Sequence, residues 1–155
     1  MKNLVIIISM ILAFWSCKSG DTLSKAEDAA QITEKIESAD YTFVPRSVSP
    51  MRGKNIPINY SYFLKVKKDT ISAYLPYFGR AYSAPYGGDG GIKFESTNFE
   101  YLLSEKKKGE WNVKININDD NKRYDLSLEI GDSGYAFLSV RDNSRDPISF
   151  YGKIE

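Results

Sequence analysis

The sequence predicts a mainly β protein, an antiparallel β sandwich or barrel of about nine strands with one N-terminal α-helix. Three observations predict this fold class. Apolar and polar residues alternate with a period of two over much of the chain after residue 40. Short segments rich in Gly, Asp and Asn separate these runs and are typical of turns. Aromatic residues make up 14% of the chain, and strands favour aromatic side chains.

One helix is expected before the strands, over roughly Lys25–Ala39. Ser24 and Glu27 have the spacing of a capping box, in which two side chains satisfy backbone N–H groups at a helix start. Small or apolar residues then recur on one helical face at Ala26, Ala29, Ala30, Thr33 and Ile36. This face is thin, so we expect the helix to lie on a sheet rather than to form a core of its own.

The clearest strands form a three-stranded antiparallel meander. Trp111–Asn118 and Arg123–Ile130 alternate apolar and polar residues around a turn at Asp119–Lys122. Gly131–Gly134 makes the next turn and leads into Tyr135–Val140. The other strands are expected at Tyr41–Ser47, Tyr60–Lys67, Thr70–Leu75, Ile92–Glu95, Phe99–Lys106 and Ile148–Ile154, with a loop at Gly53–Pro57.

The first 16 residues have the pattern of a bacterial lipoprotein signal peptide. Lys2 precedes an apolar run of about a dozen residues, which is too short to span a bilayer as a helix. Ser16 then precedes Cys17, the only cysteine, and lipoprotein processing lipidates such a thiol and cuts the chain before it. Phe14 and Trp15 depart from the strict consensus. An ordinary secretory signal or an uncleaved anchor is therefore the alternative.

These features divide the chain into a lipoprotein signal peptide at 1–16, a lipidated tether at 17–23 and a single β-rich domain at 24–155. Each buried CH₂ of an acyl chain contributes about 0.8 kcal/mol, so two or three chains on Cys17 would hold the protein stably in a membrane. The membrane is therefore an expected partner. The expected location is the cell envelope, on the outer membrane, with the periplasmic and surface faces both left open.

The composition argues against several function classes. Without the signal peptide the chain carries 20 basic and 20 acidic residues, so no basic excess exists to bind nucleic acid. The chain has no histidine, and its one cysteine is expected to carry lipid. His-based catalytic triads, thiol nucleophiles and His or Cys zinc sites are therefore unavailable. We expect a protein that is not an enzyme and needs no metal or cofactor, with a carboxylate-based hydrolase as an alternative.

The segment Leu75–Phe94 is the candidate site. It joins two predicted strands through about 16 residues, and long ordered loops often carry function. Its candidate ligand-binding residues are Tyr77, Arg80, Tyr82 and Tyr86. Tyrosines could stack on a glycan or line a cleft for an apolar small molecule, and an arginine could bind a carboxylate. Alternatively, the segment only covers one end of the barrel, with Arg80 bound to carbonyl groups or to a core carboxylate.

The predicted lipid anchor, the β-rich domain and the candidate loop together favour two functions. The first is a non-catalytic, lipid-anchored ligand-binding module, which predicts an accessible groove beside the Leu75–Phe94 segment. The second is a structural or assembly subunit that contacts other envelope proteins. An assembly subunit predicts an exposed apolar patch or an unpaired strand edge.

Two segments resemble a known family. Leu75–Tyr82 (LPYFGRAY), followed by Pro85–Gly87 and Gly90–Phe94, is similar to the signature of the domain-of-unknown-function 4251 family. Members of this family are small exported lipoproteins of Bacteroidetes. Arg145–Ile154 resembles the closing strand of the family, and the resemblance extends over about Tyr41–Ile154. It implies an envelope lipoprotein and implies no activity.

Overall fold

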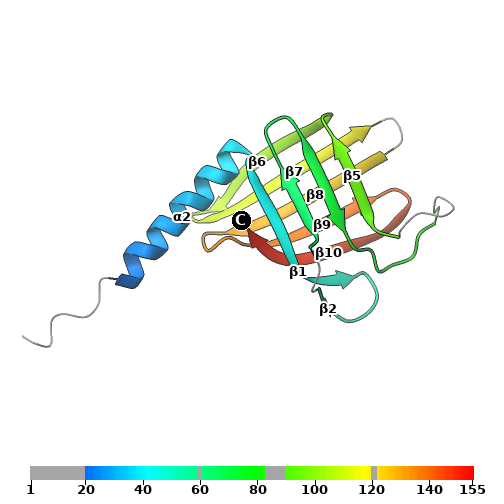
Figure 1. The fold of residues 1–155 in the computed structure, drawn as a ribbon, viewed down its shortest axis with the longest axis horizontal. Coiled ribbons are helices and arrows are strands. Elements are labelled where there is room, and N and C mark those ends of the chain that lie inside the picture. Colours follow the sequence, from blue (N-terminus) through cyan, green and yellow to red (C-terminus); the bar gives the residue numbers. More distant parts are fainter. Residues whose placement is uncertain (1–19, 59–60, 83–89, 120–121) are drawn as a thin grey trace, which may run out of the picture.

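The computed structural model describes residues 20–58, 61–82, 90–119 and 122–155. In this part of the chain one helix, α2 (Gly20–Ser38), precedes ten strands that form a single antiparallel sheet (Figure 1). A mainly β fold with one N-terminal helix is therefore confirmed. The strands are β1 (Tyr41–Pro50), β2 (Ile56–Pro57), β3 (Phe63–Val66), β4 (Ile71–Leu75), β5 (Ile92–Ser96), β6 (Phe99–Lys107), β7 (Glu110–Asp119), β8 (Lys122–Gly131), β9 (Tyr135–Asp142) and β10 (Arg145–Ile154).

The nine strands expected from the sequence are all present, but the loop expected at Gly53–Pro57 is wrong in one respect. Ile56 and Pro57 form the short strand β2, which pairs with Val48 and Ser47 of β1. Both residues of β2 are exposed. A two-residue exposed strand that contains a proline has no alternating pattern, so the sequence could not reveal it.

The sheet is strongly curled. Its strand order is β5-β4-β3-β1-β10-β9-β8-β7-β6, so the two edge strands are neighbours in the sequence. Only Thr97 and Asn98 join them, and this short link holds the two edges together at one end. The Asn98 side-chain amide donates to the Asn118 carbonyl oxygen (2.7 Å), and the Ser96 hydroxyl donates to an Asp119 carboxylate oxygen (3.0 Å). The result is a half-barrel built from one continuous sheet.

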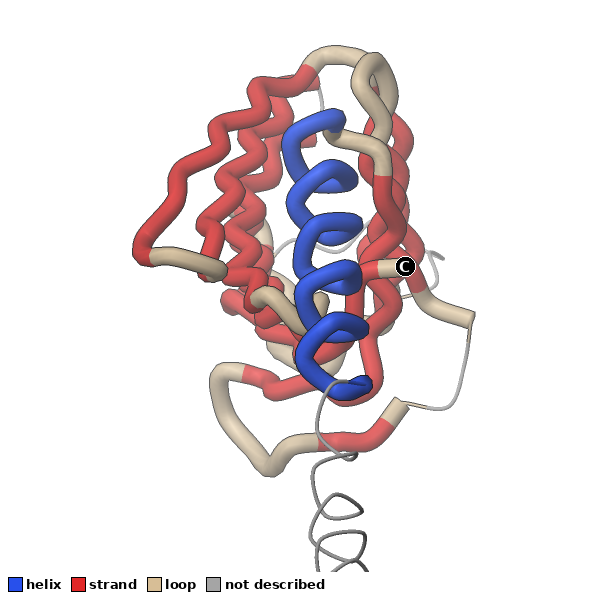
Figure 2. Tube along the Cα trace, turned by 90° about the vertical axis from the view of Figure 1, so that its left-hand side faces the viewer, coloured by secondary structure: helices blue, strands red, loops and turns tan. Residues whose placement is uncertain are grey.

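The helix covers one end of this half-barrel. Figure 2 shows α2 in front of the curled sheet, with strands on either side of it. Ile32 and Ile36 are buried in the main core, and the Tyr101 hydroxyl donates to the Ile36 carbonyl oxygen (2.8 Å). The expected helical face was partly wrong, because Ala26 and Ala30 are exposed. The helix is fixed to the half-barrel chiefly by its two isoleucines.

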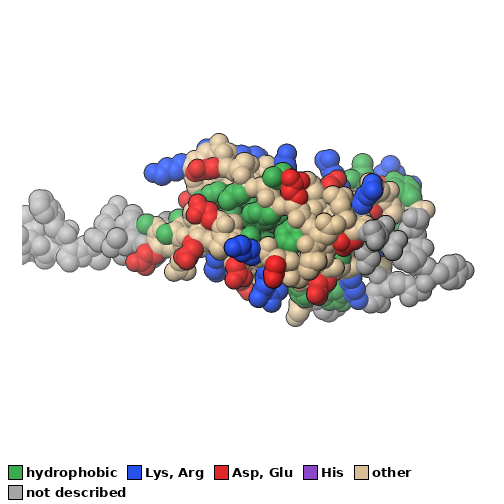
Figure 3. Space-filling view, turned by 90° about the horizontal axis from the view of Figure 1, so that it is seen from above, with side chains coloured by type: hydrophobic (Ala, Val, Ile, Leu, Met, Phe, Trp, Pro, Cys, Tyr) green, Lys and Arg blue, Asp and Glu red, His purple; other side chains and the backbone are tan. Residues whose placement is uncertain are grey.

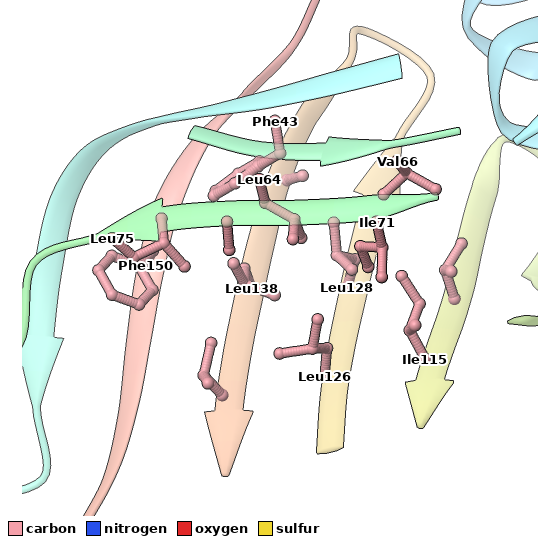
Figure 4. Packing of buried hydrophobic residues seen from close by; sticks show 14 of the residues in the cluster. Phe43, Leu64, Val66, Ile71, Leu75, Ile115, Leu126, Leu128, Leu138 and Phe150 are labelled. Carbon is pink, nitrogen blue, oxygen red and sulfur yellow. The ribbon is translucent and has the colours of Figure 1, made fainter. Parts of the chain in front are cut away.

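The inside of the curl is a packed hydrophobic core. Strands β3 and β4 fold back over β8, β9 and β10, and their side chains meet in the middle (Figure 4). Leu64 and Ile71 on one side face Leu128 and Leu138 on the other, and all four are fully buried. The polar positions of the strands alternate with these and mostly point outward, with Ser96 of β5 as a buried exception. Candidate ligand sites therefore have to be sought on the outer surface.

The outer surface mixes charges of both signs. Seen from above, acidic and basic side chains are interspersed around a central group of hydrophobic side chains (Figure 3). No helix among the described residues is both long and apolar enough to cross a membrane.

Candidate functional site

The segment after β4 folds back on itself at once. Pro76 follows Leu75 and has no N–H group to donate, which ends the strand. The Tyr77 hydroxyl then lies 2.8 Å from the Arg80 carbonyl oxygen and 3.1 Å from the Asp146 carbonyl oxygen. Gly79 makes this approach possible, since a Cβ there would lie 2.6 Å from the Tyr77 hydroxyl oxygen. Tyr77 thus fixes the turn and is half-buried.

Residues 80–82 then run along the beginning of β10. Ala81 forms a β-bridge with Arg145. The Tyr82 N–H donates to the Ser144 carbonyl oxygen (2.7 Å), and the Asp146 N–H donates to the Arg80 carbonyl oxygen (3.0 Å). The two sequence segments that carry the family resemblance therefore meet in space at this point.

Arg145 is the centre of this contact. Its side chain is only 13% exposed. One terminal nitrogen donates to the carbonyl oxygens of Gly90 (3.2 Å) and Gly91 (3.1 Å). The guanidinium also lies over the Tyr77 ring, 5.2 Å from its centroid, and 3.6 Å from an Asp142 carboxylate oxygen. Arg145 therefore ties together both ends of the segment that links β4 to β5.

The sequence drew attention to Arg80, whereas the arginine that binds carbonyl groups and a carboxylate is Arg145. Arg80 is exposed. The residues of the Leu75–Phe94 segment could not indicate Arg145, because Arg145 lies more than fifty residues further along the chain. The sequence signal that could have indicated Arg145 was its position at the start of the last strand, β10.

Tyr82 lies on the surface beside Arg80. It is 72% exposed, and its hydroxyl donates to the Asp146 carboxylate. That hydrogen bond to the carboxylate, together with its charge, raises the pKa of Tyr82. Burial is the main reason that the pKa of Tyr77 is also raised. Tyr86, the fourth candidate, and the lipidation candidate Cys17 lie outside the described residues.

Tyr77 also lines an open depression of about 290 Å³ on the surface. Four of its nine lining residues are aromatic, and Phe78 is 44% exposed. The Tyr62 and Tyr74 rings pack against each other with centroids 5.2 Å apart, and the Lys93 Nζ lies 4.7 Å from the centroid of the Tyr74 ring. The residues that line this aromatic depression are Tyr62, Tyr74, Leu75, Pro76, Tyr77, Phe78, Gly90, Gly91 and Lys93.

The aromatic depression brings together only part of the predicted site. Tyr77 lines it, whereas Arg80 and Tyr82 do not. Sequence reasoning missed Tyr62, Tyr74 and Lys93, which come from neighbouring strands and their flanks. The signal for Tyr74 was an aromatic residue at an outward, normally polar position of a strand.

The carboxylates near the loop are engaged in structural contacts. Asp142 accepts hydrogen bonds from the Ser144 N–H and hydroxyl (both 2.8 Å) and pairs with Arg145. Asp146 accepts the Tyr82 hydroxyl. Among the described residues, no group of three or more Asp, Glu, Cys or His side chains could hold a metal ion. The chemistry that this site offers is stacking and hydrogen bonding.

Comparison with known proteins gives a family. The model of the domain of unknown function (DUF4251) matches residues 24–154. The fold is similar to the crystal structure of a DUF4251 family protein from Bacteroides eggerthii DSM 20697, with a TM-score of 0.63 and 13% sequence identity over 85% of this chain and 89% of that one. No curated protein matches the chain. Because the family model matches most of its length, this protein belongs to the DUF4251 family.

Proposed function

We propose that this protein is a lipid-anchored, non-catalytic module of the cell envelope that binds a ligand in the aromatic depression. The observation that carries the proposal is an open hollow of about 290 Å³ lined by four aromatic side chains, with Arg145 bonded to two glycines of its rim. Exposed aromatic side chains gathered at one hollow are a common feature of binding sites. If the Leu75–Phe94 segment only covered one end of the barrel, the aromatic rings at this hollow would be buried.

The shape of the depression suggests the class of ligand. Tyr74 and Phe78 are both partly exposed, so a flat ligand can lie against their rings. Glycine at positions 90 and 91 adds no side chain to the rim. A glycan with an apolar ring face, or an apolar small molecule, has the matching surface. The carbonyl groups of both glycines are already bonded to Arg145, so the rings supply most of the contact.

A thermal-shift screen of the soluble chain from Lys18 onward tests this proposal with glycans, bile acids and lipids. A ligand that binds only the folded state raises the melting temperature, by an amount that grows with its concentration. Phe78→Ala and Tyr74→Ala should remove the shift. Leu102→Ala is a suitable control, because Leu102 is equally exposed (46%) on the distant strand β6. A shift that survives both aromatic substitutions would contradict the proposed site.

The lipid anchor is a separate part of the proposal. The helix α2 begins at Gly20, three residues after Cys17, so an acylated cysteine would place the helix directly at the membrane surface. Cys17→Ala should release the protein from the membrane fraction, because acyl chains are the only expected anchor. Ultracentrifugation of cell lysates measures this. Retention of the variant in membranes would contradict lipidation at Cys17.

A second function, assembly with other envelope proteins, is favoured by the edge strand β6. Leu102 and Leu103 are 46% and 38% exposed there, and β6 pairs with β7 on one side only within the described sheet. A photo-crosslinking residue at position 102 should then give one discrete crosslinked product in intact cells. The same probe at position 65, on the outer face of β3, should give none. Equal crosslinking at both positions would contradict the assembly function.

A further inference from the structure

A second hollow lies on the outer face of β7, β8 and β9, far along the sheet from the aromatic depression. Its volume is about 370 Å³, within the range of about 300–1,000 Å³ that ligand sites have. The register places Lys114 opposite Ser127, and Ser127 opposite Ser139, in one row across three strands. The next row across the same strands is Asn116, Asp125 and Arg141. We call this hollow the outer-face groove.

The cations of the outer-face groove have no partner within the described chain. Arg141 lies opposite Asp125 in the register, yet no ion pair joins them, and Lys114 makes no hydrogen bond or ion pair among the described residues. On the same face, Lys106 forms an ion pair with Glu129 (2.5 Å). Strand spacing and rise place the two cations about 10 Å apart across the sheet and about 7 Å along it. A ligand in the groove would therefore meet two positive charges and the Asp125 carboxylate, and the lining as a whole carries one net positive charge.

Aromatic side chains lie next to the groove on β9 and β10, outside its lining. Phe137 lies two residues before Ser139 on β9, so it points to the same outer face. Tyr151 is paired with Phe137 across β10, and both side chains are partly exposed. The Tyr151 and Tyr135 rings are parallel, with centroids 5.8 Å apart. The groove thus has small hydroxyl side chains beside charged ones in its lining, and Phe137 lies next to it, opposite Glu129.

We propose that the outer-face groove binds an acidic oligosaccharide, a chain of sugar rings that carry carboxylates. One carboxylate pairs with the planar guanidinium of Arg141 and another with Lys114. Sugar hydroxyls bond to Ser127 and Ser139, and a ring face packs on Phe137. An acidic peptide fits this surface less well. The strands β7, β8 and β9 are paired on both sides, so no backbone edge is available for strand addition.

Titration of the full-length chain in detergent micelles tests the proposal. The probes are a four-unit oligogalacturonate, the neutral galactose oligomer of the same length and a glutamate oligomer of equal charge. The oligogalacturonate should bind at least about tenfold more tightly than either of the others. Its affinity should fall when salt is raised from about 50 mM to about 500 mM, because ions screen charge attraction. Absence of saturable binding, or equal affinity for the glutamate oligomer, would overturn the proposal.

Variants locate the site and separate it from the aromatic depression. Arg141→Met and Lys114→Met should each weaken oligogalacturonate binding about tenfold, which is about 1.4 kcal/mol. Ser139→Phe should abolish binding by filling the groove, and its urea midpoint shows whether the variant is folded.

Lys65→Met, which removes an exposed cation on β3, is the matched control and should leave the affinity unchanged. Full affinity in Arg141→Met would overturn the proposal. Phe78→Ala should have no effect, so the outcome is independent of the proposed function.

Discussion

At the residue scale, Arg145 explains why the segment between β4 and β5 has a defined shape at its two described ends. A single buried guanidinium contacts two glycine carbonyl oxygens, a tyrosine ring and a carboxylate. Removal of this side chain leaves the part-buried Gly91 carbonyl oxygen and one Asp142 carboxylate oxygen without this partner, and such a loss costs more than the contact itself contributes. Arg145 is therefore a structural residue that positions the aromatic depression, whereas exposed Arg80 has no such role.

Arg145→Met should lower the free energy of unfolding by about 2–3 kcal/mol, since the Gly90 and Gly91 carbonyl groups and one of the two Asp142 carboxylate oxygens lose their contact with the guanidinium. Urea unfolding followed by tryptophan fluorescence measures the change. Arg80→Met is the matched control, because an exposed arginine of the same segment should cost less than about 0.5 kcal/mol. Equal losses in the two variants would contradict the role given to Arg145.

Tyr41 is a residue through which the fold should lose stability at alkaline pH. Burial raises the pKa of Tyr41 well above its ordinary value, and the neighbouring Tyr101 raises it further. A pKa that is higher in the folded than in the unfolded chain means that the folded state holds the proton more tightly. This stabilisation is complete below about pH 10, the unfolded pKa, and is lost as the pH rises through the higher folded value.

The expected result is a falling urea midpoint above about pH 10 in the natural protein. Tyr41→Phe cannot ionise, so its midpoint should fall less steeply between about pH 10 and pH 11.5. At pH 8 the variant should be close to the natural protein, because the lost contact with the Tyr101 hydroxyl is long (3.5 Å). Parallel curves for the two proteins would show that Tyr41 does not control the alkaline loss of stability.

At the scale of elements, the bulge in β1 depends on a glycine in β10. The register of these two strands shifts between Pro45 and Ser47, opposite Gly152 and Tyr151. A Cβ on Gly152 would collide with the Val44 carbonyl oxygen and lie 2.8 Å from the Pro45 Cα. These are backbone atoms, so they cannot move aside as a flexible side chain could. The close approach of two strands therefore requires glycine at this position.

Gly152→Ala should destabilise the protein by about 2–4 kcal/mol, because the added methyl group forces β1 and β10 apart. Gly90→Ala is the control, since a Cβ at that position meets nothing within 4 Å. Urea midpoints of the two variants give the comparison. A loss of less than about 0.5 kcal/mol in Gly152→Ala would mean that the strands adapt without strain.

The elements that the sequence predicted well are those that depend on local pattern. Strands β7, β8 and β9 are long, alternate strictly and are separated by short turns, so each can be recognised in isolation. The strand β2 and the burial of Ile32 depend on tertiary contacts instead. The same difference between local pattern and tertiary contact decides which residues of the candidate site could be predicted. Tyr77 could be selected from its own segment, whereas Tyr62 and Arg145 reach it only through strand pairing and the bridge to β10.

At the scale of the whole molecule, the packed core lies inside the half-barrel and both proposed binding sites lie on its outer face. Its interior is filled with buried aliphatic and aromatic side chains, so this region serves packing. Its outer face carries the aromatic depression at one end of the strand order and the outer-face groove toward the other end. The sequence predicted the mainly β class because aromatic content and alternation act over the entire chain. It could not predict how far the sheet curls, which follows from the short link between β5 and β6.

The most direct test of the central proposal is an NMR titration with the ligand that gives the largest thermal shift. Amide ¹H–¹⁵N spectra of the chain from Lys18 onward would be recorded at increasing ligand concentration. The account predicts that shift changes concentrate at Tyr74, Phe78 and Gly91, which line the aromatic depression. Changes confined to β7–β9, or scattered over the surface without saturation, would contradict binding at the aromatic depression.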